Sequence, residues 1–356
     1  MINTIPCSPG EIERILDEAY KLREALFLWG EPGVGKSDMV KHFVRKKSMQ
    51  LVDLRLTTMD SPDLRGLMWI NEEKGVTQWY RPEFFPVDDK PGIIFLDERT
   101  AADQRMQATT YQLVLDRCVG PHRLPDSWWV VGAGNSPEDG AISYRMGSAL
   151  ADRFIHLYIV PDAKDWIKWA TEKGVHPHVI SFIQVKPDFL NSVQGQKKTD
   201  QLISPSPRSW ERVSNILKST KSDKTVSILI NGLIGEAAAV EFFQVIQEIA
   251  ELPKIEDLLR APAARAVERV PKKIAALYGL TYSLLAFCET TVDFTRAIDL
   301  LDALADVGDG LPRAEIQTLG MELILEKALK RGLREEIANS AAYQRYVPKA
   351  EQLVGA

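Results

Sequence analysis

Residues 27–40 read FLWGEPGVGKSDMV, an apolar run followed by glycines, a Lys-Ser pair and the start of a helical segment. The stretch fits the pattern G-x-x-x-x-G-K-[ST], with Gly30, Gly35, Lys36 and Ser37 in register. Glycines allow a turn tight enough for several backbone N–H groups to point at phosphate oxygens. A glycine-rich turn without a ligand is the alternative, but the flanking strand and helix that a phosphate loop requires are both indicated. The sequence therefore predicts a nucleoside triphosphate site.

The predicted ATP-binding residues form the loop and the first helical turn: Gly30, Glu31, Pro32, Gly33, Val34, Gly35, Lys36, Ser37 and Asp38. Lys36 is expected to reach the β- and γ-phosphates, and Ser37 to place its hydroxyl on Mg²⁺. Asp97 ends the apolar run GIIFLD at residues 92–97. An acid at the tip of a strand beside the phosphate loop can hold the Mg²⁺ shell. The predicted cofactors are ATP and Mg²⁺, with Ser37 and Asp97 as the metal-binding residues.

Two more polar residues stand at the ends of apolar runs. Glu98 follows Asp97 directly and can polarise a water for attack on the γ-phosphate, a role that a kinase would avoid. Asn135 follows WWVVGAG, where its amide can hydrogen-bond both the attacking water and a γ-phosphate oxygen. Each has a plainer interpretation, a charged strand end for Glu98 and a turn residue for Asn135. Their occurrence together with the phosphate loop favours catalytic roles for both.

The order of apolar and helical segments predicts an α/β domain followed by helices. Five continuous apolar runs are typical of strands in a parallel sheet covered on both faces: 26–29, 51–56, 92–97, 128–134 and 154–160. From residue 161 onward the pattern is helical, and prolines interrupt it. We therefore predict an α/β nucleotide-binding domain with a parallel five-stranded sheet at 1–160, a helical lid at 161–252 and a helical C-terminal extension at 253–356.

The stretches around three arginines resemble motifs of a known family. The stretch GSALADRFIHL, residues 147–157, resembles the AAA+ ATPases, in which an arginine before the final strand points into the neighbouring subunit's nucleotide. Arg153 matches that arginine finger, and Arg145 is a second candidate for a contact in trans. Arg208, near the start of the helix in SPSPRSWERVSNILKS, matches the sensor-2 arginine of AAA+ lids. The plainer alternatives are an ion pair of Arg153 with Asp152 and a solvated Arg208.

Within the AAA+ ATPases the chain most resembles the MoxR family. The resemblance rests on TMDSPDLRGL at 58–67, a hairpin-like insertion MWINEEKGVTQWYRP at 68–82 and a second hairpin CVGPHRLP at 118–125. It covers roughly residues 5 to 220. The resemblance implies a chaperone-like ATPase that forms a ring, a homohexamer, and remodels a protein partner. A protein with a von Willebrand A domain is one such partner in that family.

Other functions of a phosphate loop fit less well. A GTPase would need an Asp-x-x-Gly after the Mg²⁺ strand and an Asn-Lys-x-Asp, and neither stands in the required place. A nucleic-acid-dependent motor, helicase-like or DNA-remodelling, is the main alternative, but the two hairpins are mixed in charge and the chain has a net charge of −5. A nucleotide-binding scaffold that hydrolyses little is a third. Hydrolysis that drives conformational change in a protein partner is therefore favoured over nucleic-acid work.

Composition bears on the compartment. The three cysteines, Cys7, Cys118 and Cys288, are far apart and show no metal-binding spacing, which favours a reducing environment. No apolar run reaches the roughly 18 residues of a membrane helix. The pair His176 and His178 is interpreted as a loop entering a helix, not as a metal site. A cytoplasmic protein without a membrane segment is expected.

Overall fold

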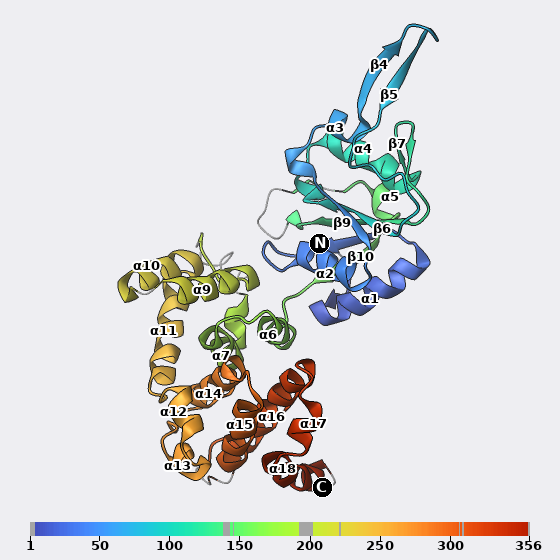
Figure 1. The fold of residues 1–356 in the computed structure, drawn as a ribbon. Coiled ribbons are helices and arrows are strands. Elements are labelled where there is room, and N and C mark those ends of the chain that lie inside the picture. Colours follow the sequence, from blue (N-terminus) through green and yellow to red (C-terminus); the bar gives the residue numbers. More distant parts are fainter. Residues whose placement is uncertain are drawn as a thin grey trace. The chain divides into compact units, whose positions relative to one another are not determined.

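The computed structural model describes residues 4–137, 143–144, 146–191, 202–220, 222–305, 307 and 310–354. They fall into two compact units (Figure 1). The sheet unit runs to Trp166 and includes Ser206–Arg208. The helical unit holds residues 167–191, Ile203–Pro205 and the described residues from Ser209 onward. Each unit is described by itself below.

Six parallel strands form the central sheet of the sheet unit, in the order β1-β10-β2-β9-β6-β3. Their bounds are β1 (Pro6–Cys7), β2 (Leu26–Trp29), β3 (Gln50–Arg55), β6 (Gly92–Asp97), β9 (Trp128–Gly134) and β10 (Ile155–Ile159). The five predicted strands are all present, each within one residue of its expected ends, so the parallel α/β fold is confirmed. The sixth strand, β1, has only two residues, which are too few to show a sequence pattern.

Helices cover both faces of this sheet (Figure 1). Successive residues of each strand point to opposite faces, so they pack with different helices. In β6, Ile93 and Phe95 pack with α1 (Pro9–Leu22) and α2 (Lys36–Lys46). The intervening Ile94 and Leu96 pack with residues of α3 (Ser61–Arg65) and α4 (Gln104–Leu115). Helix α5 (Ser148–Ala151) and the turns η1 (Leu56–Thr58) and η2 (Arg99–Ala101) complete the layer on that second side. Both faces of β6 are buried, which explains its continuous apolar run.

The sequence of helix α1 explains where the helix begins and which of its faces packs on the sheet. Ser8 accepts a hydrogen bond from the backbone N–H of Glu11, and the Glu11 carboxylate accepts one from the N–H of Ser8. This reciprocal cap satisfies two N–H groups that a helix start leaves without partners. Ile12, Leu16 and Ala19 then follow at helical spacing and are buried against the sheet.

Two antiparallel hairpins extend from the sheet unit, as the insertion pattern predicts. The longer one pairs β4 (Leu67–Asn71) with β5 (Val76–Tyr80) and projects well beyond the sheet (Figure 1). The shorter one pairs β7 (Cys118–Val119) with β8 (His122–Arg123). At the base of the longer hairpin, Gly66 has a φ of 85°, in the left-handed region that glycine tolerates. A Cβ there would lie 1.9 Å from the carbonyl oxygen of Tyr80.

Gly66→Ala should therefore disrupt the base of the β4–β5 hairpin. Both the positive φ and the backbone clash oppose a side chain, so we expect a loss of at least ~2 kcal/mol in the free energy of unfolding. Gly75 at the hairpin turn is the matched control, because it also has a positive φ, 60°, but has nothing within 4 Å of its Cβ position. Gly75→Ala should cost only about 1 kcal/mol. Equal urea-unfolding curves for Gly66→Ala and Gly75→Ala would refute this assignment.

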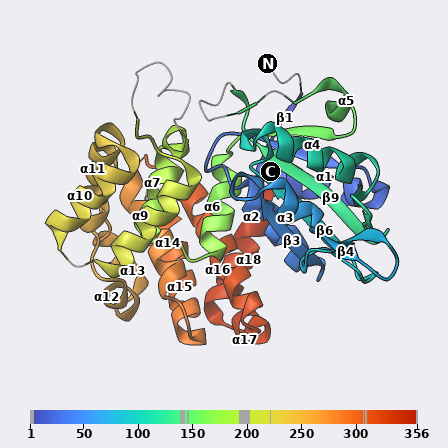
Figure 2. The same ribbon diagram turned by 90° about the horizontal axis from the view of Figure 1, so that it is seen from above.

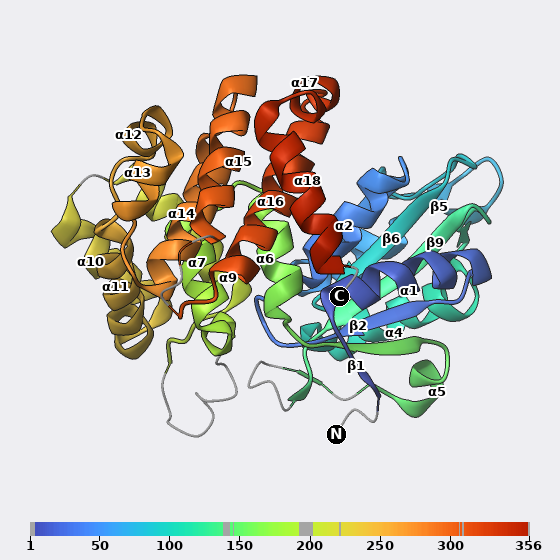
Figure 3. The ribbon, with the colours of Figure 1, turned by 90° about the horizontal axis from the view of Figure 1, so that it is seen from below.

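The helical unit is a stack of helices (Figures 2 and 3). Its elements are α7 (Pro177–Val185), η4 (Pro187–Leu190), α10 (Asp223–Ile234), α11 (Glu236–Ala250), α12 (Ile255–Arg260), α13 (Ala263–Glu268), α14 (Ile274–Phe287), α15 (Thr291–Ala305), α16 (Arg313–Lys330), α17 (Arg334–Ala338) and α18 (Ala341–Val354). Two helices, α6 (Ala163–Glu172) and α9 (Pro207–Ser219), have residues in both units. Helix α14 is buried almost all round and packs against α7, α11 and α16. Within the described residues, no helix is long and apolar enough to cross a membrane.

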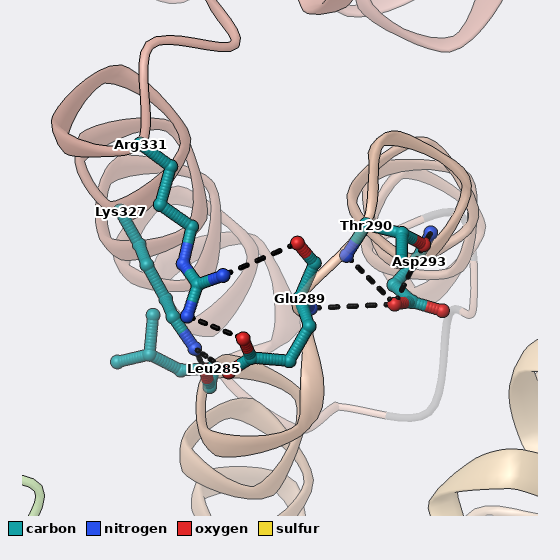
Figure 4. Close-up of polar contacts among 6 residues, drawn as sticks. All are labelled: Leu285, Glu289, Thr290, Asp293, Lys327 and Arg331. Carbon is teal, nitrogen blue, oxygen red and sulfur yellow. Dashed lines mark hydrogen bonds and ion pairs between the residues drawn. The ribbon is translucent and has the colours of Figure 1, made fainter.

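Ionic contacts fasten the turn between α14 and α15 to α16 (Figure 4). The residues involved are Leu285, Glu289, Thr290, Asp293, Lys327 and Arg331. Lys327 donates to the Leu285 carbonyl at 2.7 Å, and Arg331 pairs with the carboxylate of Glu289. The last carbonyls of a helix lack partners in the helix, so a cation from α16 satisfies one of them at the end of α14.

His176 and His178 stand at the start of α7. His176 is the N-cap, and its Nδ1 accepts a hydrogen bond from the N–H of His178. Burial, with smaller contributions from His178 and Lys218, lowers the pKa of His176 to about 4. Burial also lowers the pKa of His178. Both imidazoles are therefore neutral in the folded protein near neutral pH.

These histidines should make the helical unit less stable in acid. The pKa of His176 falls from 6.5 to about 4 on folding, so between these values the unfolded chain binds a proton that the folded chain does not. Stability should then fall as pH drops through that window. His176→Asn keeps a capping acceptor and removes the titration, so its unfolding midpoint should depend less on pH. Thermal unfolding at about pH 7 and about pH 5 tests this, with the exposed His42→Asn as control. An unchanged pH slope in His176→Asn would contradict it.

Candidate nucleotide site

The phosphate loop joins the end of β2 to the start of α2 in the sheet unit. Gly33 and Gly35 have φ values of 83° and 96°, which turn the backbone so that α2 begins directly at Lys36. The start of α2 therefore faces the loop with the positive end of its dipole. A Cβ on Gly33 would lie 3.0 Å from Ser206 Oγ and 3.6 Å from Arg208 Cβ. Arg208, at the second position of α9, is thus adjacent to the loop.

Lys36 and Asn135 meet at the centre of the loop. The Lys36 ammonium donates to the carbonyl of Gly30 at 2.7 Å, to that of Glu31 at 3.1 Å and to Asn135 Oδ1 at 2.8 Å. Asn135 reaches it because β9 lies beside β2 in the sheet. The hydroxyl of Thr100 fixes the backbone of Asn135, donating to its carbonyl and accepting from its N–H, both at 3.1 Å. The ammonium and the amide thus share the place where terminal phosphate oxygens would be bound.

Ser37 and Asp97 form the pair expected at the metal. The Ser37 hydroxyl donates to Asp97 Oδ2 at 2.8 Å, and Asp97 Oδ1 accepts the N–H of Glu98 at 2.9 Å. Asp97 is buried at the end of β6. A hydroxyl and a carboxylate are oxygen ligands of the kind that Mg²⁺ prefers, and Mg²⁺ usually takes only one or two carboxylates together with phosphate oxygens. The donor set therefore fits Mg²⁺ bound with a nucleotide.

Glu98 is held in an unusual backbone conformation. Its φ is 54°, in the left-handed region, which is rare for a residue other than glycine. The carboxylate accepts a hydrogen bond from the Thr57 hydroxyl and lies 3.8 Å from Arg55 Nε. Its side chain is 43% exposed, so a water can reach it. Thr57 and Arg55 belong to no motif that would place them at the site from sequence; Arg55 lies beside it because it pairs in register with Asp97 across β3 and β6.

Arg153 and Arg145 were the candidates for a contact in trans. Arg153 follows α5, its side chain is exposed, and it forms no ion pair with any described residue. The alternative of a pair with Asp152 does not occur. Arg145 lies outside the described residues. An exposed guanidinium that has no acidic partner among the described residues is available to an anion from elsewhere.

Comparisons with known proteins agree with this arrangement. A family model described as the ATPase family associated with various cellular activities (AAA) matches residues 26–154. That range runs from the start of β2 to just past Arg153, and it includes the loop, Asp97, Glu98 and Asn135. No curated protein matches the sequence.

Solved structures give distant likenesses. A Cytophaga hutchinsonii protein provisionally described as an ATPase has 15% identity and a TM-score of 0.32, covering 90% of this chain and 84% of its own. The Thermotoga maritima RuvB Holliday junction branch migration motor has 13% identity and a TM-score of 0.36, covering 76% of this chain and 84% of its own. At such TM-scores the likeness carries no argument about activity. The family match does: residues 26–154, which include the phosphate loop, match the AAA ATPase family model, and the chain is an ATPase.

Proposed function

We propose that this chain is a MoxR-type, chaperone-like ATPase that remodels a protein partner as an oligomeric ring, a homohexamer. The single observation that carries the choice of a protein partner is the β4–β5 hairpin. Leu67 and Ile70 are 68% and 69% exposed there, and Met68 is also exposed. Trp69 stacks on Tyr80, with ring centroids 5.4 Å apart. Apolar side chains gathered on a projecting element typically mark a protein-binding surface.

The charges on this hairpin disfavour nucleic acid as the bound partner. Its tip carries Glu72, Glu73 and Lys74, a net negative set that phosphates would avoid. The stacked pair of Trp69 and Tyr80 is the one feature that suits bases, because aromatic rings can stack on them. A nucleic-acid motor is therefore the second candidate. Aliphatic exposure and acidic charge favour the protein partner, for which a protein with a von Willebrand A domain is one candidate.

The proposed catalytic cycle assigns roles to the residues described above. The loop residues and Lys36 would hold ATP, and Ser37 and Asp97 would hold Mg²⁺. Glu98 would polarise the water and Asn135 would orient it. Arg153 of one subunit would neutralise charge on the phosphoryl group bound by its neighbour. Bound Mg²⁺ supplies the positive charge that the β- and γ-phosphates need.

The proposal also covers the two helical regions, Arg208, Arg145 and the compartment. Residues 161–252 would act as the lid, with Arg208 sensing the bound nucleotide, and residues 253–356 would be the C-terminal extension. Arg145 remains a second candidate for the contact in trans. The cytoplasm is the proposed compartment, since the described cysteines are free thiols.

The experiment that tests the proposal compares ATPase activity with and without DNA. Single-stranded and double-stranded DNA are added at about 50 mM and about 200 mM salt. A protein remodeller should show no stimulation at either salt concentration. Robust stimulation that weakens steeply at the higher salt would overturn the choice of a protein partner. In parallel, Glu98→Gln with ATP serves as bait, and wild type with ADP is the control. A protein retained by the bait and not by the control is expected.

A further inference from the structure

His156 on β10 joins two segments that are far apart in the sequence. The indole N–H of Trp29 donates to His156 Nδ1 at 2.8 Å. His156 Nε2 lies 2.8 Å from the carbonyl oxygen of Ala151. Since an indole N–H can only donate, Nδ1 must be the acceptor, and the proton on Nε2 then donates to Ala151. Both ring nitrogens are therefore used, and the neutral tautomer is fixed by its partners.

The two hydrogen-bond partners of His156 lie close in sequence to two parts of the proposed catalytic machinery, the phosphate loop and Arg153. Trp29 is the last residue of β2, and Gly30 of the phosphate loop follows it. Ala151 is the last residue of α5, two positions before Arg153. The bridge of Trp29, His156 and Ala151 thus connects the strand that carries a subunit's own phosphate loop to the segment that carries its arginine.

Packing makes this bridge stiff. The rings of Trp29 and His156 are stacked, with centroids 5.9 Å apart and planes 27° apart. Phe27 and Phe154 pack beside them in one buried cluster on this face of the sheet. Trp29 is only 5% exposed. A shift of Trp29 would therefore be passed on to His156, because a packed aromatic cluster has no space to absorb it.

Helix α5 is short and is held in place by its surroundings, among them the cluster that buries Leu150. It has four residues, and its N-cap residue, Gly147, has no side chain for a capping hydrogen bond. Among the described residues, the carbonyl of Ala151 accepts one other hydrogen bond, from the N–H of Phe154 at 3.2 Å. A single helical turn is not stable by itself in water. The orientation of the segment that leads to Arg153 thus depends on its contacts, and His156 supplies a side-chain hydrogen bond to it.

We infer that His156 is a positioning residue for Arg153: it ties the arginine that a subunit gives to its neighbour to the phosphate-loop strand of its own site. The inference rests on the proposed role of Arg153 in trans. Through this bridge, a movement of the loop strand on nucleotide binding would reposition the arginine. The state of one site would then influence hydrolysis at the next.

Two substitutions each remove one half of the bridge. His156→Asn keeps an acceptor near the position of Nδ1 and loses the donor to Ala151. Trp29→Phe keeps an aromatic ring and loses the N–H that holds Nδ1. Both should lower kcat by ~10- to 100-fold, because a misplaced charged group loses much of its effect on the transition state. The KM for ATP should stay within about two-fold, since the cis loop is intact. His42→Asn, an exposed histidine on α2, is the control and should match wild type.

Mixing subunits locates the defect. His156→Asn subunits mixed with Glu98→Gln subunits should recover activity, since a His156→Asn site can use the intact Arg153 of a Glu98→Gln neighbour. His156→Asn mixed with Arg153→Ala should recover none, because both lack a placed arginine. Damage to the cis site would give the reverse: recovery with Arg153→Ala and none with Glu98→Gln. That reverse result, or wild-type kcat in His156→Asn, would overturn the inference.

A control mixture separates this inference from the proposed function. Arg153→Ala mixed with Glu98→Gln tests only whether Arg153 acts in trans. If that mixture recovers activity and the His156→Asn mixtures behave in the reverse way, the bridge alone is wrong. If the control mixture recovers no ATPase activity, Arg153 does not act in trans, and the inference about the bridge is then wrong as well. Should His156→Asn fail to fold, as judged by thermal unfolding, Trp29→Phe takes its place in every mixture.

Discussion

Glu98→Gln is expected to bind ATP with nearly wild-type affinity and to hydrolyse it at least ~100-fold more slowly, since general-base catalysis contributes about 10²- to 10⁴-fold. The amide keeps the size of the side chain and an oxygen that can accept from Thr57, so the geometry around the carboxylate position is retained. What is lost is the charge that polarises water. Phosphate release measures hydrolysis, and titration calorimetry with ATP measures binding.

The control for Glu98→Gln is the same chemical change at an exposed site. Among the residues that the structure describes, Glu18 on α1 pairs only with Lys21, and it is largely exposed. Glu18→Gln should hydrolyse ATP at the wild-type rate. If Glu98→Gln matches wild type as well, Glu98 is not the base, and the interpretation of the acid pair after β6 is wrong.

Lys36→Ala should abolish measurable ATP binding. The ammonium lies at the centre of the loop, and it already donates to the Gly30, Glu31 and Asn135 oxygens that surround the phosphate position. Charge-assisted hydrogen bonds to phosphate are among the strongest in proteins, so we expect Kd to rise at least ~100-fold. Calorimetric titration with ATP in the presence of Mg²⁺ measures the change.

Lys46 offers a matched control on the same helix. It lies in the last turn of α2, away from the loop, and pairs with Glu13. Lys46→Ala also removes one positive charge but none at the phosphates, so its Kd should equal that of wild type. A Kd for Lys36→Ala within a few-fold of wild type would show that the loop does not bind phosphate in the expected way.

The sheet and the loop could be predicted because their signals are local. Strands β2, β6 and β9 are buried on both faces and read as continuous apolar runs, and the glycines of the loop stand beside them. Residues at the carboxyl ends of parallel strands meet at one edge, which is why Asp97 and Asn135 could be assigned to the loop from sequence. The hairpins were predicted from resemblance to a family and are present.

The contacts that orient these residues could not be predicted. Thr57 reaches Glu98 only because β3 pairs with β6 in a particular register, and a one-residue shift would turn it away. The bond from Trp29 to His156 joins residues 127 positions apart, and no spacing rule links them. His156 reads in sequence as one polar residue within an apolar strand. Its role depends on which side chains the fold brings to its two nitrogens.

The central claim is that ATP hydrolysis at one subunit requires Arg153 of its neighbour. The most direct measurement is the ATPase rate of Arg153→Ala and Glu98→Gln subunits, each alone and mixed in equal amounts. Each variant alone should be nearly inactive. The mixture should recover a substantial part of the wild-type rate, because some interfaces then join an intact Glu98 to an intact Arg153. A mixture as inactive as its parts, or wild-type activity in Arg153→Ala alone, would contradict the account.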